Sequence, residues 1–268
     1  MDDRSRLSIW TDALQRLVMI NTASKLLPLY IVTEYPKSGG TWITQVLSEC
    51  LELPFPRNQR PQWQSAMMHG HMKYSPTMSN VIVVFRDGRD CMVSWYFHTL
   101  FQNDKNSPIL VEKTRRDLSF ADIDDVNANL PRFIEYIFEK DKSSLSPYKF
   151  TWAQFVRNWS ERDCAMLKYE AMVEDGVNEI ARVLAELGRN DIPRERIEKV
   201  VEKFSFANQA KRKPGEENKG SFLRKGQPGD WKNKFNRASS EIFDHYAGNE
   251  LISLGYEKNR NWVSETAE

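Results

Sequence analysis

A run of five apolar residues, Val81–Phe85, constrains the fold of this chain more than any other segment. The run is rich in Val and Ile, which favour strands. Because it is not interrupted by polar residues, it predicts a strand buried on both faces, as in a parallel sheet covered by helices. The charged stretch Arg86–Asp90 ends the run, and residues 91–100 then have the spacing of a helix.

Two further segments repeat this pattern of strand followed by helix. Residues 29–33 predict a strand, which a glycine-containing loop joins to a helix over residues 41–51. Residues 165–169 predict another strand, followed by a helix over residues 177–187. Because strands and helices alternate, we expect an α/β fold with a central parallel sheet of four or five strands flanked by helices. A chain of 268 residues fits one domain, 1–268.

Three segments lie outside the alternating pattern. Residues 1–27 predict a helical extension, whose apolar side chains we expect to pack on the core; a role at a membrane surface is the alternative. Residues 102–130 are a long excursion, rich in Asp, Asn and Lys, of the kind that surrounds a site. We expect residues 95–150 and 205–230 to form lid segments over substrate and cofactor. Residues 211–234 hold eight Lys or Arg against three acids. We expect that stretch to wrap around an anion, and the alternative is that it forms a solvated surface loop.

Composition excludes several classes of protein. The chain carries 38 basic and 37 acidic side chains, which argues against a nucleic-acid binder. Its three cysteines, Cys50, Cys91 and Cys164, contain no CxxC pair, so neither a disulfide scaffold nor a structural zinc site is expected. The N-terminus lacks the pattern of a signal peptide, and no apolar run reaches the ~20 residues of a membrane span. We therefore expect a soluble, cytoplasmic protein.

The segment Tyr35–Trp42, with the sequence YPKSGGTW, has the composition of a phosphate-binding loop. A loop between a strand and a helix presents backbone N–H groups and the positive end of the helix dipole to an anion. Gly39 and Gly40 allow close approach, Lys37 adds a charge and Thr41 a hydroxyl. The lysine precedes the glycines, unlike the order GxxxxGK[ST] of magnesium-dependent nucleotide loops.

Two further segments carry groups suited to phosphate. Arg86 ends the central strand, and its guanidinium matches phosphate oxygens, although pairing with Asp87 or Asp90 is the alternative. Ser94 follows eight residues later, where a hydrogen bond to its own helix backbone is the alternative. Arg224, Lys225 and Gly226 can hold one anion through two side chains and a backbone N–H.

Together these segments resemble the signatures of the cytosolic-type sulfotransferases, which move a sulfuryl group from 3'-phosphoadenosine 5'-phosphosulfate (PAPS) to an acceptor. The family sequence YPKSGTTW is YPKSGGTW here, its arginine and serine eight residues apart match Arg86 and Ser94, and its RKGxxGDWK matches Arg224–Lys232. The resemblance covers about residues 28–243. It implies a P-loop-containing three-layer fold and an enzyme of EC 2.8.2 type, with PAPS as donor, adenosine 3',5'-bisphosphate (PAP) as product and no metal.

The resemblance also implies which residues bind the donor. The loop for the 5'-phosphosulfate would comprise Lys37, Ser38, Gly39, Gly40, Thr41 and Trp42, with Trp42 beside the adenine. The 3'-phosphate would be held by Arg86, Ser94, Arg224, Lys225 and Gly226. Tyr169 and Phe206 match aromatic residues near the adenine, and each equally fits an ordinary core position.

Catalysis requires a base for the acceptor and a cation for the leaving oxygen. The resemblance assigns the cation to Lys37, which would stabilise the bridging oxygen. The family base is a histidine in a KTHxP segment, which aligns best with His71, and His69 takes the place of the lysine. Because the proline is absent and the spacer to Arg86 is short, His69 remains an alternative base. The His69 and His71 pair has no recognisable third ligand for a metal.

The acceptor is the least defined part. The resemblance implies a hydroxyl, or less readily an amine, on a small organic molecule. A P-loop kinase or nucleoside triphosphatase is one alternative, and transfer onto a lipid, glycan or natural-product intermediate is another. The family's dimer motif KxxxTVxxxE falls on Lys232–Glu241, where Asn236 and Arg237 replace its apolar centre. The oligomeric state therefore stays open.

Overall fold

The computed structural model describes residues 6–23, 26–57, 59–101, 107–140 and 150–266. The rest of the predicted helical extension and of the 95–150 lid segment lies outside these residues. The chain divides into two compact units: unit 1 comprises Met1–Phe85 and Arg162–Ser205, and unit 2 comprises Arg86–Glu161 and Phe206–Glu268. In the described part of the chain, no helix is long and apolar enough to cross a membrane.

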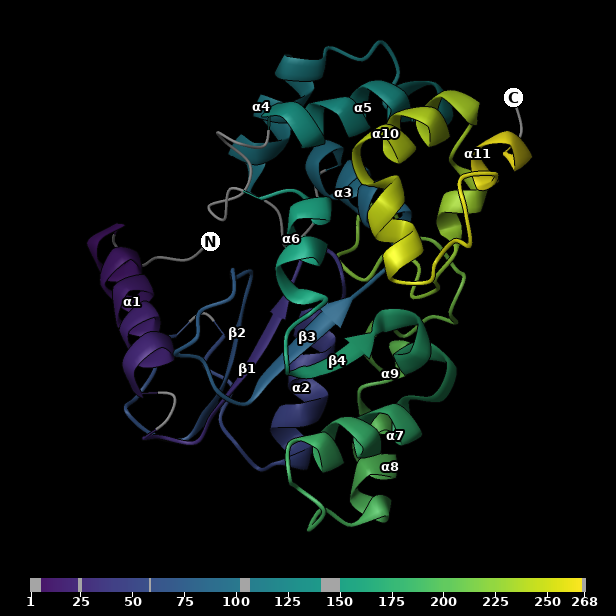
Figure 1. The fold of residues 1–268 in the computed structure, drawn as a ribbon. Helices are drawn as coiled ribbons and strands as arrows, with labels where there is room; N and C mark the ends of the chain where they lie inside the picture. The colour runs from purple at the N-terminus through teal and green to yellow at the C-terminus, as the bar shows by residue number, and fades with distance from the viewer. Residues whose placement is uncertain (1–5, 24–25, 58, 102–106, 141–149, 267–268) are drawn as a thin grey trace. The chain divides into compact units, whose positions relative to one another are not determined.

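Unit 1 contains a sheet of four strands, all parallel, in the order β2-β1-β3-β4 (Figure 1). Three of these are the predicted strands: β1 (Leu29–Glu34), β3 (Val81–Phe85) and β4 (Ala165–Lys168). The remaining one, β2 (Ala66–Gly70), was not predicted. The α/β fold with a central parallel sheet is confirmed.

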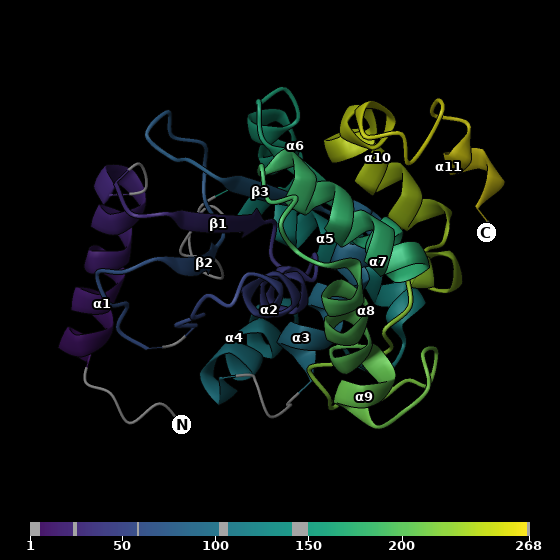
Figure 2. The ribbon, with the colours of Figure 1, turned by 90° about the horizontal axis from the view of Figure 1, so that it is seen from below.

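Three helices of unit 1 bury apolar side chains in one core with this sheet. They are α2 (Gly40–Cys50), α7 (Tyr169–Glu186) and α8 (Arg194–Lys203) (Figure 2). On α2, Ile43, Val46 and Leu47 recur at helical spacing and are fully buried with Val32 and Val84 of the sheet. α7 begins directly after β4, earlier than the predicted start at residue 177. Its backbone kinks at Asp175, close to that predicted start.

The N-terminal helix α1 (Arg6–Val18) continues into the π-helical turn η1 (Met19–Ala23). The prediction that its apolar side packs on the core is wrong, because Trp10 is 62% and Leu17 59% exposed. The polar side of α1 faces the protein instead. Gln15 Nε2 donates to the carbonyl of Pro61 at 2.5 Å, and Asp12 is buried. Carbonyl groups of an irregular segment therefore orient this helix through its polar side chains.

Unit 2 is helical and has a core rich in aromatic side chains. Its elements are α3 (Gly88–Leu100), α4 (Pro108–Leu118), α5 (Val126–Lys140), α6 (Trp152–Trp159), α9 (Phe206–Ala210), the 3-10 turn η2 (Asp230–Asn233), α10 (Arg237–Ser253) and α11 (Trp262–Glu265). Trp152 is buried, and its Nε1 donates to the carbonyl of Arg86 at 3.0 Å. The basic segment before η2 has neither helix nor strand from residue 211 on, as its composition indicated. A lid function of the two predicted segments stays a prediction.

A buried arginine joins several parts of unit 2. Arg89 is 1% exposed, and its guanidinium lies 2.7 Å from Asp87 Oδ2 and 2.5 Å from Glu257 Oε1. The same group lies 3.6 Å from the centre of the Trp231 ring and 4.7 Å from that of Trp262. Burial opposes the charge, but the two carboxylates outweigh it and raise the pKa of Arg89. This residue therefore remains charged in the core of unit 2.

We expect Arg89→Met to lower the free energy of unfolding by about 3–5 kcal/mol, because it leaves Asp87 buried without its counter-charge. Urea unfolding followed by tryptophan fluorescence measures the change. The matched control is Arg237→Met, which breaks an exposed pair with Glu241 on α10 and should cost less than about 1 kcal/mol. Equal losses in the two variants would contradict this account of Arg89.

Candidate active site

The predicted phosphate loop joins β1 to α2 in unit 1. Lys37 has a φ of 78° and Gly39 a φ of 91°, so the chain turns twice through the left-handed region, where only glycine is unstrained. The N–H groups of Trp42 and Ile43 donate to the carbonyl of Gly39 at 3.0 and 3.2 Å, which starts the helix at this point. The loop thus places the N-terminus of an 11-residue helix directly after a strand, the arrangement that favours an anion.

Tyr169, the first residue of α7, packs directly on this loop. A Cβ atom at Gly39 would lie 2.6 Å from Cδ2 of Tyr169, so only glycine fits there. The rings of Tyr169 and Trp42 meet edge to face, with centres 5.9 Å apart. The structure therefore brings Tyr169 together with two residues of the phosphate loop, Gly39 and Trp42, which were all predicted to bind the donor.

His69 is the last but one residue of β2, which pairs with β1, and His71 directly follows the end of that strand. Thr33 pairs with Gly70, so the residues one step further along each strand are neighbours. His71 Nδ1 lies 3.0 Å from the backbone oxygen of Glu34, and His69 Nε2 lies 3.1 Å from Oε1 of the same residue. The other carboxylate oxygen of Glu34 accepts from the Gly40 N–H at 2.5 Å.

Glu34 was not among the site residues predicted from the sequence. The signal available was one acidic residue that ends an apolar strand directly before the phosphate loop. Burial raises the pKa of this carboxyl, but the hydrogen bond from His69, the electrostatic influence of the neighbouring His69 and His71 and the Gly40 N–H together hold it below the usual range. Glu34 is therefore an ionised, buried carboxylate at the start of α2.

The environment of His71 keeps its ring neutral. Burial is the largest influence and lowers the pKa, and the neighbouring His69 ring and the charge of Lys37 lower it further, against the opposing effect of Glu34. A backbone oxygen can only accept, so Nδ1 carries the proton and Nε2 carries the lone pair. A neutral imidazole with its lone pair on Nε2 is the form that a general base requires.

In unit 2, Asp90 connects the start of α3 to the basic segment. Its carboxylate accepts from the N–H groups of Gly229 at 2.7 Å and Trp231 at 2.9 Å. Arg86 Nη2 lies 3.8 Å from Asp90 Oδ2, so the alternative pairing with Asp90 is present in the structure. Ser94 lies one helical turn beyond Asp90 and is half-buried.

The other predicted cations of unit 2 converge on Asp230. Arg224 Nη2 lies 2.7 Å from Asp230 Oδ2, Lys225 pairs with Oδ1, and Arg224 also pairs with Glu217. Burial raises the pKa of Asp230, but these two cations outweigh it and lower the pKa overall. The guanidinium of Arg224 lies 4.5 Å from the centre of the Phe97 ring on α3.

Gly226 and Phe206 also lie together. Gly226 has a φ of 63°, and a Cβ atom there would lie 2.1 Å from Cδ2 of Phe206. Arg212, which the sequence analysis did not single out, lies 5.5 Å from the Phe206 ring and donates from Nη1 to the carbonyl of Arg224 at 3.1 Å. In the sequence, the only indication of a role for Arg212 was its position in the basic segment.

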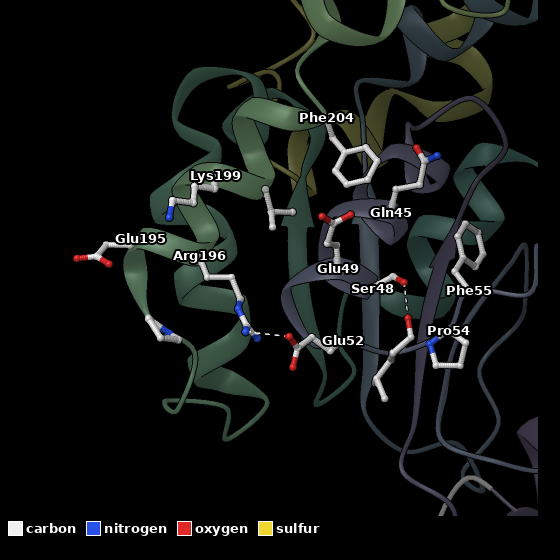
Figure 3. A pocket seen from close by; sticks show the side chains of 13 residues that line it. Gln45, Ser48, Glu49, Glu52, Pro54, Phe55, Glu195, Arg196, Lys199 and Phe204 are labelled. Atoms are coloured by element: carbon white, nitrogen blue, oxygen red, sulfur yellow. Dashed lines mark hydrogen bonds and ion pairs between the residues drawn. The ribbon is translucent and has the colours of Figure 1, made fainter.

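A cavity of about 860 Å³ lies elsewhere in unit 1, between the second half of α2 and α8 (Figure 3). Its charged walls are partly paired, since Arg196 Nη2 lies 2.9 Å from Glu52 Oε1. None of the predicted site residues lines it. The residues with the relevant chemistry, and not this cavity, therefore define the candidate site.

Metal and thiol chemistry find no support among the described residues. No group of three or more His, Cys, Asp or Glu side chains there could hold a metal ion. Burial raises the pKa of Cys50 and of Cys164 to about 11 each, so both are thiols at neutral pH and poor nucleophiles.

The sequence is similar to known sulfotransferases. It is 24% identical over 265 residues to Sulfotransferase 1E1 of Cavia porcellus, covering 81% of each chain. It is 26% identical over 265 residues to Sulfotransferase 1A1 of Rattus norvegicus, covering 81% of this chain and 82% of that one. An amine sulfotransferase of Oryctolagus cuniculus is 24% identical over 247 residues, covering 83% and 80%.

Solved structures share the fold. The mouse sulfotransferase SULT7A1 complexed with PAP matches with a TM-score of 0.61 at 17% identity, covering 97% of this chain and 96% of that one. Retinol dehydratase in complex with retinol and PAP matches with a TM-score of 0.58 at 16% identity, covering 90% and 86%. The same enzyme with androsterone and PAP gives 0.54 at 16% identity, covering 89% and 85%.

The family profile of the sulfotransferase domain matches residues 58–255, well over half of the chain. The resemblance drawn from the three sequence motifs is thereby confirmed, and the kinase alternative is set aside. The chain belongs to the sulfotransferase family and is a PAPS-dependent sulfotransferase.

Proposed function

We propose that this sulfotransferase transfers the sulfuryl group to a hydroxyl, less readily an amine, of a small organic acceptor, with His71 as the base. The observation that carries the proposal is the hydrogen bond from His71 Nδ1 to the Glu34 carbonyl, which leaves the lone pair on Nε2. The retinol dehydratase structures hold retinol and androsterone, which are both alcohols, and this supports a hydroxyl. Because an amine sulfotransferase is among the similar proteins, an amine is the second candidate for the acceptor group.

The chemistry follows from two side chains of unit 1. PAPS, when bound, supplies a sulfuryl group on a bridging oxygen of its 5'-phosphate. His71 Nε2 takes the proton of the acceptor hydroxyl as the acceptor oxygen bonds to sulfur and the bond from sulfur to the bridging oxygen breaks. Lys37 stabilises the negative charge left on that oxygen.

The donor-binding residues of the proposal fall into two sets. In unit 1, Lys37–Trp42 hold the 5'-phosphosulfate at the start of α2, and Tyr169 and Trp42 contact the adenine. This is supported by the left-handed Gly39 and by the packing of Tyr169 on it. In unit 2, the 3'-phosphate binds to a set of predicted residues, Arg86, Ser94, Arg224, Lys225 and Gly226, and Phe206 contacts the adenine. The convergence of Arg224 and Lys225 on one carboxylate supports a site for a second anion.

Calorimetric titration with PAP tests the 3'-phosphate site. We expect Arg224→Ala to weaken PAP binding about 10- to 100-fold, because charge-assisted hydrogen bonds contribute about 1.5–3 kcal/mol each. Arg237→Ala, which removes an exposed arginine of α10, should leave the affinity of PAP unchanged. Equal affinity in wild type and Arg224→Ala would contradict the assignment of Arg224.

Gly226→Ala tests whether Phe206 contacts the donor. The new Cβ would displace the Phe206 ring, so we expect PAP binding to weaken at least several-fold. Gly188→Ala is the matched control, because Gly188 also has a positive φ, 73°, but no atom lies within 4 Å of its Cβ position. Both variants should lose about 1 kcal/mol of stability from backbone strain. A PAP affinity that falls equally in both would argue against the role of Phe206.

His71→Asn tests the base. With 35S-labelled PAPS and a panel of phenols, steroid alcohols, retinol and amines, we expect turnover to fall at least 100-fold while PAP binding is retained. The control is His245→Asn, a change on the exposed side of α10. Because the pKa of His71 lies below its ordinary value of 6.5, the base stays deprotonated at neutral pH, and wild-type kcat/KM should fall only below pH 6.5. Full turnover in His71→Asn would overturn the assignment.

A further inference from the structure

The carboxylate of Glu34 joins the phosphate loop to the two histidines. It ends β1, is 4% exposed, and accepts from the Gly40 N–H through one oxygen and from His69 through the other. The backbone oxygen of the same residue accepts from His71. One residue therefore contacts both candidate bases and the first residue of α2.

Gly40 and Glu34 fit together as a pair. A Cβ atom at Gly40 would lie 2.6 Å from Cδ of Glu34 and 2.9 Å from each of its oxygens. Any larger residue at position 40 must therefore push the carboxylate away from the Gly40 N–H and from His69. The sequence motif that this loop resembles has threonine at this position, so the glycine is accounted for by the carboxylate beside it.

The surroundings of Glu34 decide which atoms carry protons. The charged and titratable groups that influence it or the histidines are His69, His71, Arg57 and Lys37. An ionised carboxylate can only accept, so the proton of the hydrogen bond belongs to Nε2 of His69. The His69 ring also meets the rings of Phe55 and His71 edge to face, with centres 6.2 and 5.6 Å apart.

We propose that the Glu34 carboxylate is a positioning residue: it fixes the protonated Nε2 and the orientation of His69, and its charge tunes the base His71. The two side-chain contacts of Glu34 are made to His69 near the end of β2 and to Gly40 at the start of α2. Both partners belong to regular secondary structure, which holds them in place. The inference rests on the proposed role of His71 as base. Its test needs no acceptor and no turnover.

Glu34→Gln gives a sharp test because the side chain keeps its size. The Gly40 N–H can only donate, so the carboxamide oxygen must face it and the carboxamide NH2 must face His69. His69 Nε2 then has to accept, and its proton moves to Nδ1. At a pH at which the imidazole rings are neutral, we expect long-range 1H–15N NMR to show His69 as the Nε2–H form in wild type and as the Nδ1–H form in Glu34→Gln.

Assignments and controls come from the chain itself. His69→Asn and His71→Asn each remove one set of signals, and His98 and His245 serve as internal references. Glu49→Gln removes a carboxylate that pairs with Lys203 at 2.6 Å on the same unit, and should leave the His69 tautomer unchanged. An unchanged His69 tautomer in Glu34→Gln would overturn the proposal.

The titration of His71 gives a second readout in the same samples. The charge of Glu34 raises the pKa of His71, so its removal should move the NMR titration of His71 to lower pH. A role of Glu34 in folding alone would not move this titration in the folded protein. A titration of His71 that stays in place, or moves to higher pH, would contradict the tuning role.

Gly40→Thr covers the case in which Glu34→Gln does not fold. We expect Gly40→Thr to lower the midpoint of thermal unfolding in the wild-type background but to have little effect in Glu34→Ala, where the clash is absent. Equal losses in both backgrounds would contradict the pairing of Gly40 with Glu34. PAP titration of wild type separates the two hypotheses: absence of PAP binding defeats the proposed function, whereas PAP binding with unaltered histidines in Glu34→Gln defeats only the role of Glu34.

Discussion

Main-chain hydrogen bonds between β1 and its two parallel neighbours fix the relative positions of the site residues of unit 1. Thr33 pairs with Gly70 on one side and with Val83 on the other. The residues just beyond these pairs, Glu34 and His71, therefore meet at the same edge of the sheet, where the phosphate loop also begins. A slip of one residue would turn every side chain of a strand to the opposite face. The hydrogen bond on which the proposed base depends is thus a direct consequence of strand register.

In unit 1 the site residues are held in place by the sheet. In unit 2 buried carboxylates hold the basic segment in place. Asp90 accepts from two backbone N–H groups of the segment around Gly229, and Asp230 pairs with Arg224 and Lys225. An irregular, basic segment cannot hold its shape through a regular ladder of hydrogen bonds. Each of these carboxylates supplies fixed acceptors. Two cations outweigh the burial of Asp230 and lower its pKa, whereas burial outweighs the single cation Arg86 beside Asp90 and raises its pKa. Acidic residues thereby order a segment whose proposed ligand is an anion.

The sequence predicted β3 with its correct bounds, because the run is short, rich in Val and Ile, and ended by the charged residue Arg86. It did not predict β2, whose five residues, Ala66–Gly70, contain no β-branched side chain. Periodicity identified the apolar side of α1 but could not show whether any surface covers it. The role assigned to Glu34 depends on contacts with residues 35 positions away in sequence, which only the register of the sheet reveals.

The order of the strands also bears on how the protein is made. β3 ends at Phe85, and its parallel partner β4 begins only at Ala165, after the whole first segment of unit 2 has been synthesised. At about 5–20 residues per second, a ribosome needs several seconds to produce that interval. During this time one side of β3, a strand of five apolar residues, has no partner strand. Until Ala165–Lys168 is made, the N–H and C=O groups on that edge of β3 have no strand to pair with, and an edge of this kind is where a strand of another chain can add.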